Sequence, residues 1–404
     1  MKRGVAEGLR VLDFTWYGVG PITTKYLADN GAEVVKVESM TRPDGLRFGA
    51  PWKDGEPGIN RSQFFGSFNS SKKSITVNIS TDAGRDLVRQ LVPHFDIVAD
   101  SFRAGTMTKC GLDYPNLREL RPDLIQLSTC TQGQTGPNAT FPGFGTILAA
   151  LSGFSAVAGY SKSEIAPPYG AYTDFVAPRF ACFALLAAVE HRRRTGEGQF
   201  IDLSQYEASL HFLAPAVTDY FATGNVMQPH ANRSPRYSPH GAYRCQDEDG
   251  DERWIALAVE DDAGWEALLS VLDDDAGARR FPTQLDRIQR AGDVDDHVQA
   301  LVAQRKASEL TAALQAVGVS AYPVQSCLDL RLDPNLEAFD FWPWLHQTEC
   351  GPMPYDGLAY RLCGTPGHQT AAPNIGEHNA EIFGDFLGLT DADLERLVDQ
   401  KVIY

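Results

Sequence analysis

Two kinds of segment alternate through the first two hundred residues, and this alternation constrains the fold more than any other feature of the chain. Short runs rich in β-branched residues are separated by segments with the spacing of amphipathic helices. Such alternation is typical of βαβ units, which build a parallel sheet covered by helices. We therefore predict an α/β fold with a Rossmann-like large domain. The strand-like runs are LRVLDF, EVVKVE, SITVNI, DIVAD and LIQLSTC.

The pattern changes near residue 225, and a chain of 404 residues is long enough for two domains. The segment NRSPRYSPHGAYRCQDEDGDERWIALAV is rich in turn-forming and acidic residues, and a helical stretch begins at Trp265. We expect residues 1–224 to form the first part of the large domain. Residues 225–330 are expected to form a small α+β domain, and residues 331–404 to return to the large domain.

The formal net charge of −16 disfavours nucleic acid and anionic membrane surfaces as partners, because both attract a basic face. No apolar run is long enough for a membrane span, and the run after Asp174 contains Arg179. The N-terminal residues lack the apolar core of a signal peptide, so we expect a cytoplasmic protein. The seven cysteines and nine histidines show no ligand spacing, and neither a metal site nor a disulfide framework is predicted.

The turn after the first strand, TWYGVGP, partly imitates a dinucleotide-binding fingerprint. Gly18 is followed by Gly20, and Glu38 ends the second strand twenty residues after Gly18. Thr23 holds the place of the third glycine, however, and Pro21 lacks the N–H that would face a pyrophosphate. An NAD-dependent dehydrogenase is disfavoured but stays an alternative, and the glycine turn still lets a ligand approach the backbone.

The stretch GAYTDFVAPRF places one carboxylate, Asp174, ahead of an apolar, helix-like run. An acid at such a place commonly caps a helix. With Asp174 as the cap, Pro178 would be the fourth helical residue and would remove the first hydrogen bond of the helix. If Pro178 is instead the first helical residue, Asp174 lies upstream as a free carboxylate near the positive helix end. A structural and a catalytic role for Asp174 both stay open on these grounds.

Further stretches follow one another in a recognisable order along the chain. They are LRVLDFTWYGVGPITTKYLADNGAEVVKVE, FNSSKKSITVNI, FRAGTMTKCGLDYPNLRELRPDLIQLS, GQTGP, YTDF, HRRRTGEGQFIDLSQYEASL, NRSPRYSPHGAYRC and IGEHNAEIFGDFLGL. Together they resemble the family III CoA transferases, which include formyl-CoA transferase, carnitine CoA transferase and the α-methylacyl-CoA racemases. The resemblance implies a large Rossmann-like domain built from both chain ends, a smaller domain between them, and two subunits interlocked as rings.

For the activity, the resemblance implies transfer of CoA between organic acids. The family's catalytic aspartate falls on Asp174, which would attack a donor such as succinyl-CoA, form a mixed anhydride and then carry CoA as an aspartyl thioester. A carboxylate with an ordinary pKa of about 3.9 needs no neighbouring base, provided that burial does not raise its pKa far. We expect backbone donors to hold its charge. The CoA thioester is then a substrate, and no tightly bound cofactor is expected.

The resemblance also implies where CoA binds. The family places the nucleotide near NSSKKS and after FRAG, where cations would neutralise phosphates, and the turn after the first strand flanks CoA. A solvated surface cation is the alternative for each basic residue at these places. The expected contacts are Tyr17, Gly18, Lys72, Lys73, Arg103 and Lys109.

Departures from the family pattern bear on the branch to which the chain belongs. The racemases carry a His-Asp pair where this chain has Phe144 and Gly145, and two-base proton exchange then loses one base. We therefore expect transfer rather than racemisation, and the resemblance implies a homodimer. A racemase, an intramolecular CoA isomerase and a non-catalytic subunit of a heteromeric transferase are the alternatives.

The acyl pocket is expected to differ from that of formyl-CoA transferases. Their glycine-rich flap is absent, and SPHGAY stands near its place. We expect His240 and Gly241 to line the acyl pocket together with Phe144. Pro178 stands where relatives keep glycine, and its effect on the helix end is an open question.

Overall fold

The computed structural model describes residues 4–166, 168–248 and 250–404. The chain divides into two compact units, each with its own hydrophobic core. Unit 1 combines Met1–Phe154, Pro168–Asn225 and Asn335–Tyr404, and unit 2 combines Ser155–Pro167 and Val226–Pro334.

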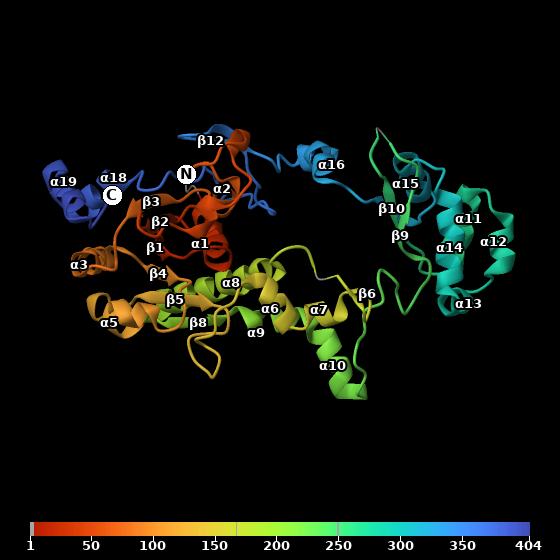
Figure 1. The fold of residues 1–404 in the computed structure, drawn as a ribbon, viewed down its shortest axis with the longest axis horizontal. Coiled ribbons are helices and arrows are strands. Elements are labelled where there is room, and N and C mark those ends of the chain that lie inside the picture. The colour runs from red at the N-terminus through yellow and green to blue at the C-terminus, as the bar shows by residue number, and fades with distance from the viewer. Residues whose placement is uncertain (1–3, 167, 249) are drawn as a thin grey trace. The chain divides into compact units, whose positions relative to one another are not determined.

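A six-stranded parallel sheet forms the centre of unit 1 (Figure 1). The strand order is β3-β2-β1-β4-β5-β8, a doubly wound order that reverses between β1 and β4. The α/β class predicted from the alternating segments is thereby confirmed. The strands are β1 (Arg10–Phe14), β2 (Glu33–Glu38), β3 (Lys73–Thr76), β4 (Ile97–Asp100), β5 (Ile125–Cys130) and β8 (Phe200–Ser204).

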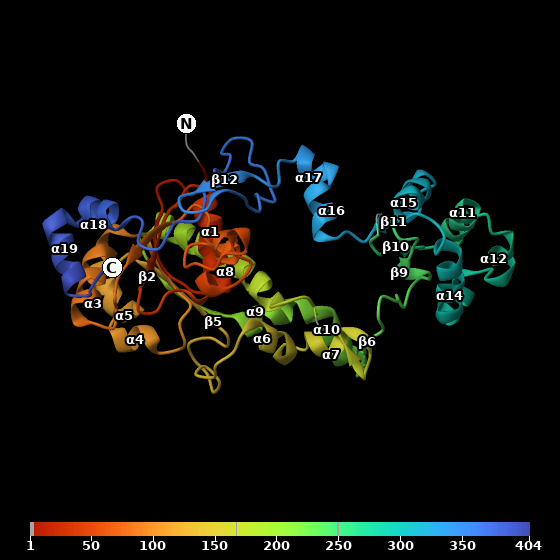
Figure 2. The ribbon, with the colours of Figure 1, turned by 45° about the horizontal axis from the view of Figure 1, so that its top comes forward.

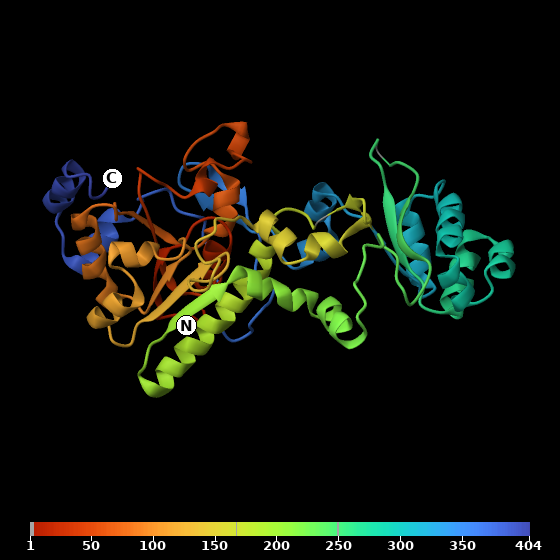
Figure 3. The same ribbon diagram turned by 60° about the horizontal axis from the view of Figure 1, so that its bottom comes forward.

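Helices cover both faces of this sheet, because successive strand residues point to opposite sides. On β1, Val11 packs in the core that includes α1 and α8, whereas Leu12 packs in the core that includes α3 and the C-terminal α18. Figure 2 shows α18 and α19 beside α3, and Figure 3 shows the long α8 along the sheet. These helices are α1 (Val19–Asp29), α3 (Asp82–Leu91), α8 (Tyr172–Thr195), α18 (Asn379–Leu387) and α19 (Asp391–Asp399).

The remaining elements of unit 1 are short and connect or flank the sheet. A small antiparallel pair, β12 (Trp344–Gln347) and β13 (Gly351–Pro354), packs in a separate cluster with α1 and α2. The helices are α2 (Gln63–Phe68), α4 (Thr106–Cys110), α5 (Tyr114–Leu120), α6 (Gly145–Leu151), α9 (Gln205–Leu210) and α10 (Ala214–Thr223), with single 3₁₀ turns at Gly45–Phe48, Lys53–Gly55, Val92–His94 and His211–Leu213.

Helix α8 begins earlier than either sequence interpretation allows. It starts at Tyr172 with Ala171 as its N-cap, so Asp174 is the third helical residue and Pro178 lies inside the helix. Asp174 therefore does not cap the helix, and Pro178 is not its first residue. Pro178 is tolerated although it has no N–H to donate to the Asp174 carbonyl one turn earlier. The apolar packing of the helix on the sheet, through Ala177, Ala181 and neighbouring residues, outweighs this local penalty.

By length and composition, α8 is also apolar enough to cross a membrane, with a mean hydropathy of 1.4 over its best window. One such helix is weak evidence, since core helices of soluble proteins pass the same test. Here Leu185 and Ala188 are fully buried against the sheet, whereas Phe183 and Leu186 are exposed. One side of α8 thus packs in the core of unit 1, and its other side exposes apolar residues that no other part of the described chain covers.

Unit 2 packs helices against a three-stranded antiparallel sheet of order β11-β10-β9. Its core is built from Ile255 and Leu257 of the central strand with Trp265 from α11 and Phe281, which directly follows α12. A short pair, β6 (Gly159–Ser161) and β7 (Glu164–Ile165), belongs to the same unit. The elements are β9 (His240–Arg244), β10 (Trp254–Ala258), β11 (Ser320–Pro323), α11 (Asp262–Leu272), α12 (Asp275–Arg280), α13 (Gln284–Gln289), α14 (Ala291–Val302), α15 (Ala307–Ala316) and α16 (Cys327–Leu332), while α7 (Phe154–Val157) and α17 (Pro334–Ala338) lie at the unit boundaries.

Candidate active site

A cavity of about 570 Å³ opens at the carboxyl ends of the parallel strands in unit 1. It spans the point between β1 and β4 where the strand order reverses, the place where open α/β sheets bind ligands. Its walls are formed by residues after β1, β2, β3, β4 and β5, by the segment Phe141–Gly145, and by two single side chains, Asp174 and Gln205. Three arginines but no lysine and no histidine belong to the lining among the described residues.

The Asp174 carboxylate lies in a slot between two glycines. A β-carbon placed on Gly18 would come within 2.7 Å of Asp174 Oδ2, and one placed on Gly145 would come within 2.5 Å of Oδ1. Both positions therefore leave room for the carboxylate only because they lack a side chain. Gly18 is the N-cap of α1 and Gly145 is the first residue of α6, so two helix starts meet at this carboxylate.

One hydrogen-bond donor reaches the carboxylate among the contacts of the described residues, and it comes from a side chain. Gln205 Nε2 donates to Asp174 Oδ1 and also to the Thr173 hydroxyl at 2.9 Å. Burial raises the pKa of Asp174 to about 6, and the hydrogen bond from Gln205 opposes this rise. The backbone donors expected from the sequence are replaced by this amide. At pH 7 the carboxylate is still mostly ionised and able to act as a nucleophile.

Two cysteines, Cys110 and Cys130, also line the cavity, and Cys130 lies at the end of β5. Burial raises the pKa of the Cys130 thiol to about 11, so this thiol stays protonated at pH 7. A thiol is a poor nucleophile compared with its thiolate. Between Cys130 and Asp174, Asp174 is the group that is mostly ionised at pH 7.

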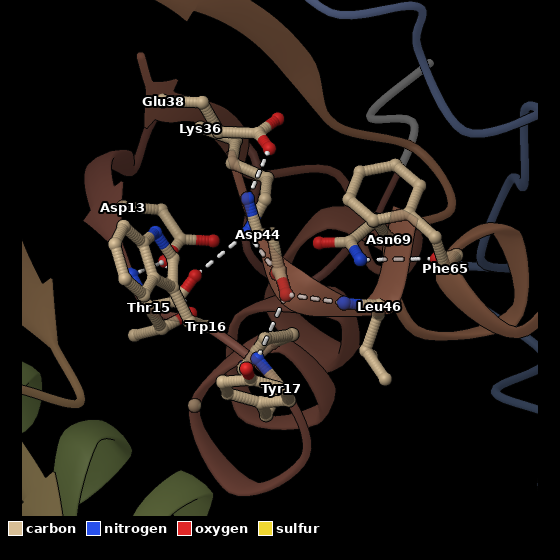
Figure 4. A network of polar contacts seen from close by, with 12 residues as sticks. Asp13, Thr15, Trp16, Tyr17, Lys36, Glu38, Asp44, Leu46, Phe65 and Asn69 are labelled. Carbon is tan, nitrogen blue, oxygen red and sulfur yellow. Dashed lines mark hydrogen bonds and ion pairs between the residues drawn. The ribbon is translucent and has the colours of Figure 1, made fainter. Parts of the chain in front are cut away.

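A buried ion pair between Lys36 and Asp44 contacts the backbone of the turn that places Gly18 against Asp174 (Figure 4). Tyr17 has a φ of 61°, a conformation that non-glycine residues rarely adopt. Its N–H donates to Asp44 Oδ1 at 3.1 Å, while Lys36 Nζ contacts Asp44 Oδ2 at 3.0 Å and donates to the Thr15 carbonyl at 2.6 Å. Lys36 and Asp44 are both fully buried. Their contacts with the Thr15 carbonyl and the Tyr17 N–H fix the backbone on both sides of Trp16.

Lys72 belongs to the same buried network rather than to the cavity wall. Its ammonium contacts Asp13 Oδ2 at 2.9 Å and donates to the Pro21 carbonyl at 3.0 Å and to Asn69 Oδ1 at 2.9 Å. Burial lowers the pKa of Lys72 to about 8, against the attraction of Asp13. The structure thus gives Lys72 a role inside unit 1, and this lysine does not face the cavity.

The other cations expected at CoA divide between cavity and surface. Arg103 lines the cavity. Lys73 pairs with Glu33 and Glu381 at 2.6 Å each, and neither Lys73 nor Lys109 belongs to the lining residues.

Two further arginines line the cavity and were missed from the sequence. Arg42 lies 5.3 Å from the centre of the Trp16 ring, and Arg85 extends from α3. Arg42 follows the end of β2 and Arg85 follows the end of β3. Ligands bind beyond the carboxyl ends of such strands, so this position in the sequence could have indicated both arginines. Gln205 was also missed, although it follows β8 directly in the same manner.

Aromatic side chains shape the cavity between these cations and Asp174. The Tyr17 and Phe144 rings meet edge to face at 5.7 Å, and the Trp16 and Phe102 rings do so at 5.1 Å. All four residues belong to the lining, as does Gly18. Tyr17, Gly18 and Phe144 are therefore brought together with Asp174.

His240 and Gly241 lie in unit 2, where they pair with Ala258 and Leu257 in the antiparallel sheet. The His240 ring contacts the Asn232 carbonyl of the same unit. Their expected contact with an acyl group stays a prediction.

The doubly wound sheet, with a cavity at its switch point that is lined by a partly buried carboxylate, is the arrangement of an α/β ligand-binding or catalytic domain. The model of CoA-transferase family III matches residues 6–379, and the chain belongs to this family. It is a CoA-transferase, and its substrates are CoA thioesters. Relatives and a solved structure agree in length and fold.

Over 401 residues the chain is 31% identical to succinyl-CoA–D-citramalate CoA-transferase of Chloroflexus aurantiacus, with 98% of each chain covered. It is 28% identical to the beta subunit of succinyl-CoA–L-malate CoA-transferase of the same organism, covering 98% of this chain and 97% of the relative. A CaiB/BaiF family protein from Brucella suis superposes with a TM-score of 0.88 at 27% identity, covering 95% of this chain and all of that chain.

Proposed function

We propose that this enzyme transfers CoA from succinyl-CoA to an organic acid through an aspartyl-CoA thioester at Asp174. The observation that carries the proposal is the position of Asp174, a half-buried carboxylate between two glycines on the wall of the cavity. A mostly ionised carboxylate with restricted water access suits nucleophilic attack on a thioester.

The reaction proceeds in two exchanges at the same carboxylate. Asp174 attacks the thioester carbonyl of the donor, CoA leaves as thiolate, and a mixed anhydride remains. The thiolate then attacks the Asp174 carboxyl carbon, which releases the donor acid and leaves CoA on the enzyme. The acceptor acid repeats these steps in reverse and leaves as its CoA thioester.

The CoA moiety lies along the cavity, with its phosphates near the arginine side chains. Arg42, Arg85 and Arg103 supply positive charge in a chain of net charge −16, and guanidinium groups bind phosphate by paired hydrogen bonds. Tyr17, Gly18 and Phe144 flank the thioester end, where the cavity reaches Asp174.

Transfer is favoured over racemisation by the residues around Asp174. A racemase needs a base on each side of the α-carbon, and no histidine lines the cavity among the residues that the structure describes. The named relatives use dicarboxylic acids, so we propose a small dicarboxylic acid as the acceptor. Because CoA thioesters are soluble substrates, we propose that the enzyme acts in the cytoplasm.

We also propose that the enzyme acts as a dimer, either of two copies or with a related subunit. Large apolar side chains are exposed on α8 and α10 of unit 1, among them Phe183 and Phe221 at 75% and 81%. Exposed apolar surface of this kind usually marks an interface. One relative is named as a subunit of a transferase, which keeps a heteromer open to test.

A single experiment tests the proposed activity. The enzyme is incubated with a panel of acyl-CoAs that includes succinyl-CoA, reduced with borohydride, and digested for mass spectrometry. We expect a mass change on the peptide that contains Asp174, and none in Asp174→Ala. Transfer activity without any modification at Asp174 would show that the nucleophile is another group.

A further inference from the structure

The side-chain amide of Gln205 has a fixed orientation against the reacting carboxylate. The Thr173 hydroxyl donates to the Gly145 carbonyl at 3.1 Å, so its oxygen accepts the hydrogen bond from Gln205 Nε2 at 2.9 Å. The same nitrogen donates to Asp174 Oδ1. Both amide protons are thereby engaged, and the nitrogen rather than the oxygen of the amide faces the carboxylate.

The backbone of Gln205 is equally well placed. Gln205 is the first residue of α9 and follows β8 directly, with Ser204 capping the helix through the Glu207 N–H at 3.2 Å. Gln205 is 5% exposed, and the Ser209 hydroxyl donates to its backbone carbonyl at 2.7 Å. A donor fixed by a strand end and a helix start needs no rearrangement when charge develops near it.

The two oxygens of Asp174 are in different surroundings. Oδ1 accepts from Gln205, whereas Oδ2 lies against Gly18 in the turn that lines the cavity. Oδ2 is thus the oxygen without a donor among the contacts of the described residues, and it is free to bond to the acyl carbon. Oδ1 then becomes the carbonyl oxygen of the mixed anhydride.

We propose that Gln205 is a catalytic residue that stabilises the negative charge on Asp174 Oδ1 when the CoA thiolate adds to the Asp174 carboxyl carbon. The inference rests on the proposed function. The new C–S bond moves an electron pair onto Oδ1 in a tetrahedral intermediate. When this pair returns, the bond from the carboxyl carbon to Oδ2 breaks. Oδ2 leaves with the donor acyl group as a free carboxylate, and the aspartyl-CoA thioester remains.

The amide interacts more strongly with this intermediate than with the resting carboxylate. In the carboxylate the negative charge is shared between two oxygens, whereas the tetrahedral intermediate concentrates it on Oδ1. An interaction that strengthens towards the transition state accelerates the step. Removal of one preorganised donor of this type lowers the rate about 10²- to 10³-fold in other enzymes.

The test compares Gln205→Leu with the wild type, using the acyl-CoA that modifies wild-type Asp174 fastest in the panel described above. Formation of the aspartyl-CoA thioester is followed by rapid quenching and mass spectrometry at pH 7 and pH 9. We expect a loss of about 100-fold or more at both pH values, with little change in KM for the acyl-CoA. Gln126→Leu is the matched control, because it removes another buried amide, on β5, which donates to the Leu112 carbonyl away from the cavity.

Each result decides between catalysis and other roles of Gln205. A loss that disappears at pH 9 would mean that Gln205 only lowers the pKa of the resting carboxylate, and the proposal is then wrong. An unchanged rate in Gln205→Leu, or equal losses in Gln205→Leu and Gln126→Leu, would also overturn the proposed role of Gln205. Labelling of Asp174 in the wild type would still support the proposed function in that case. If no acyl-CoA labels wild-type Asp174, the proposed function itself fails and the role of Gln205 fails with it.

Discussion

At the scale of single residues, the carboxylate of Asp174, the proposed nucleophile, is destabilised by its burial. A carboxyl whose pKa is raised by folding stabilises the fold below its ordinary pKa, and this contribution is lost as the pH rises through the folded value. For Asp174 that window runs from the ordinary value of 3.8 to about 6. An ionised Asp174 therefore lowers the stability of the fold at neutral pH, a trade-off that the proposed nucleophile role would explain.

Asp174→Asn is accordingly expected to inactivate the enzyme and to stabilise it. The asparagine keeps an acceptor for Gln205 but does not titrate, so at pH 7.5 the free energy of unfolding rises by on the order of 1 kcal/mol after allowance for partial exposure. Urea unfolding at pH 4 and pH 7.5 measures the effect. The gain should vanish at pH 4, and an equal gain at both values would contradict the pKa assignment.

The glycine slot gives a second prediction at this scale. In Gly145→Ala the new β-carbon meets Asp174 Oδ1 and, at 2.6 Å, the Ala171 β-carbon, so the carboxylate must turn out of its slot. We expect kcat to fall about 100-fold at equal folded fraction, as with other misplaced reacting groups, and thermal stability to fall as well, because the Ala171 β-carbon cannot turn away as the carboxylate can. Gly384→Ala, where the nearest atom is 3.8 Å away, is the control and should keep full activity. A Gly145→Ala enzyme with normal kcat would show that the slot does not orient Asp174.

At the scale of elements, the turn between β1 and α1 is a strained loop clamped by buried charges. Asp44→Ala removes the acceptor for the Tyr17 N–H and leaves Lys36 partly unpaired, whereas Asp44→Asn keeps the acceptor. We expect stability losses in both, of about 3–5 kcal/mol for the alanine variant. At equal folded fraction, kcat should fall further in Asp44→Ala than in Asp44→Asn.

The control for Asp44 is an ion pair on the surface. Glu190 pairs with Arg193 and Arg194 in an exposed position at the end of α8. Glu190→Ala should change stability by less than about 1 kcal/mol and leave kcat unchanged. Equal kcat in the two Asp44 variants, with only stability altered, would show that the turn does not position Gly18 against Asp174.

The same elements show what could be predicted from the sequence. Strand runs such as EVVKVE are local and buried on both faces, so the parallel sheet was predictable from them. The start of α8 was not, because both local interpretations of Asp174 and Pro178 neglected the packing of the helix on the sheet. The sequence suggested that Lys72 is a surface or phosphate-binding cation. In the structure Lys72 is buried and pairs with Asp13, which lies 59 positions away in the sequence. Contacts between residues far apart in the sequence position most of the side chains of the site, and local patterns do not predict them.

At the scale of the whole molecule, the apolar side chains along α8 and the helices after it have no cover within unit 1. Phe183 is 75% exposed on the side of α8 that faces away from the sheet, and Phe212 and Phe221 are exposed on the following segments. Such a surface is unfavourable in a monomer but normal in an obligate interface, which is more apolar than the remaining surface.

We therefore predict that Phe183→Glu shifts the enzyme from dimer to monomer, because a charge buried in an apolar interface is costly to desolvate. Light scattering coupled to size-exclusion chromatography measures the mass. Gln90→Glu, at an exposed position of α3, is the control and should leave the dimer intact. A wild type that is already monomeric would contradict the homodimer, and co-expression with a related subunit would then test the heteromer. If Phe183→Glu stays dimeric, the interface does not involve this face of α8.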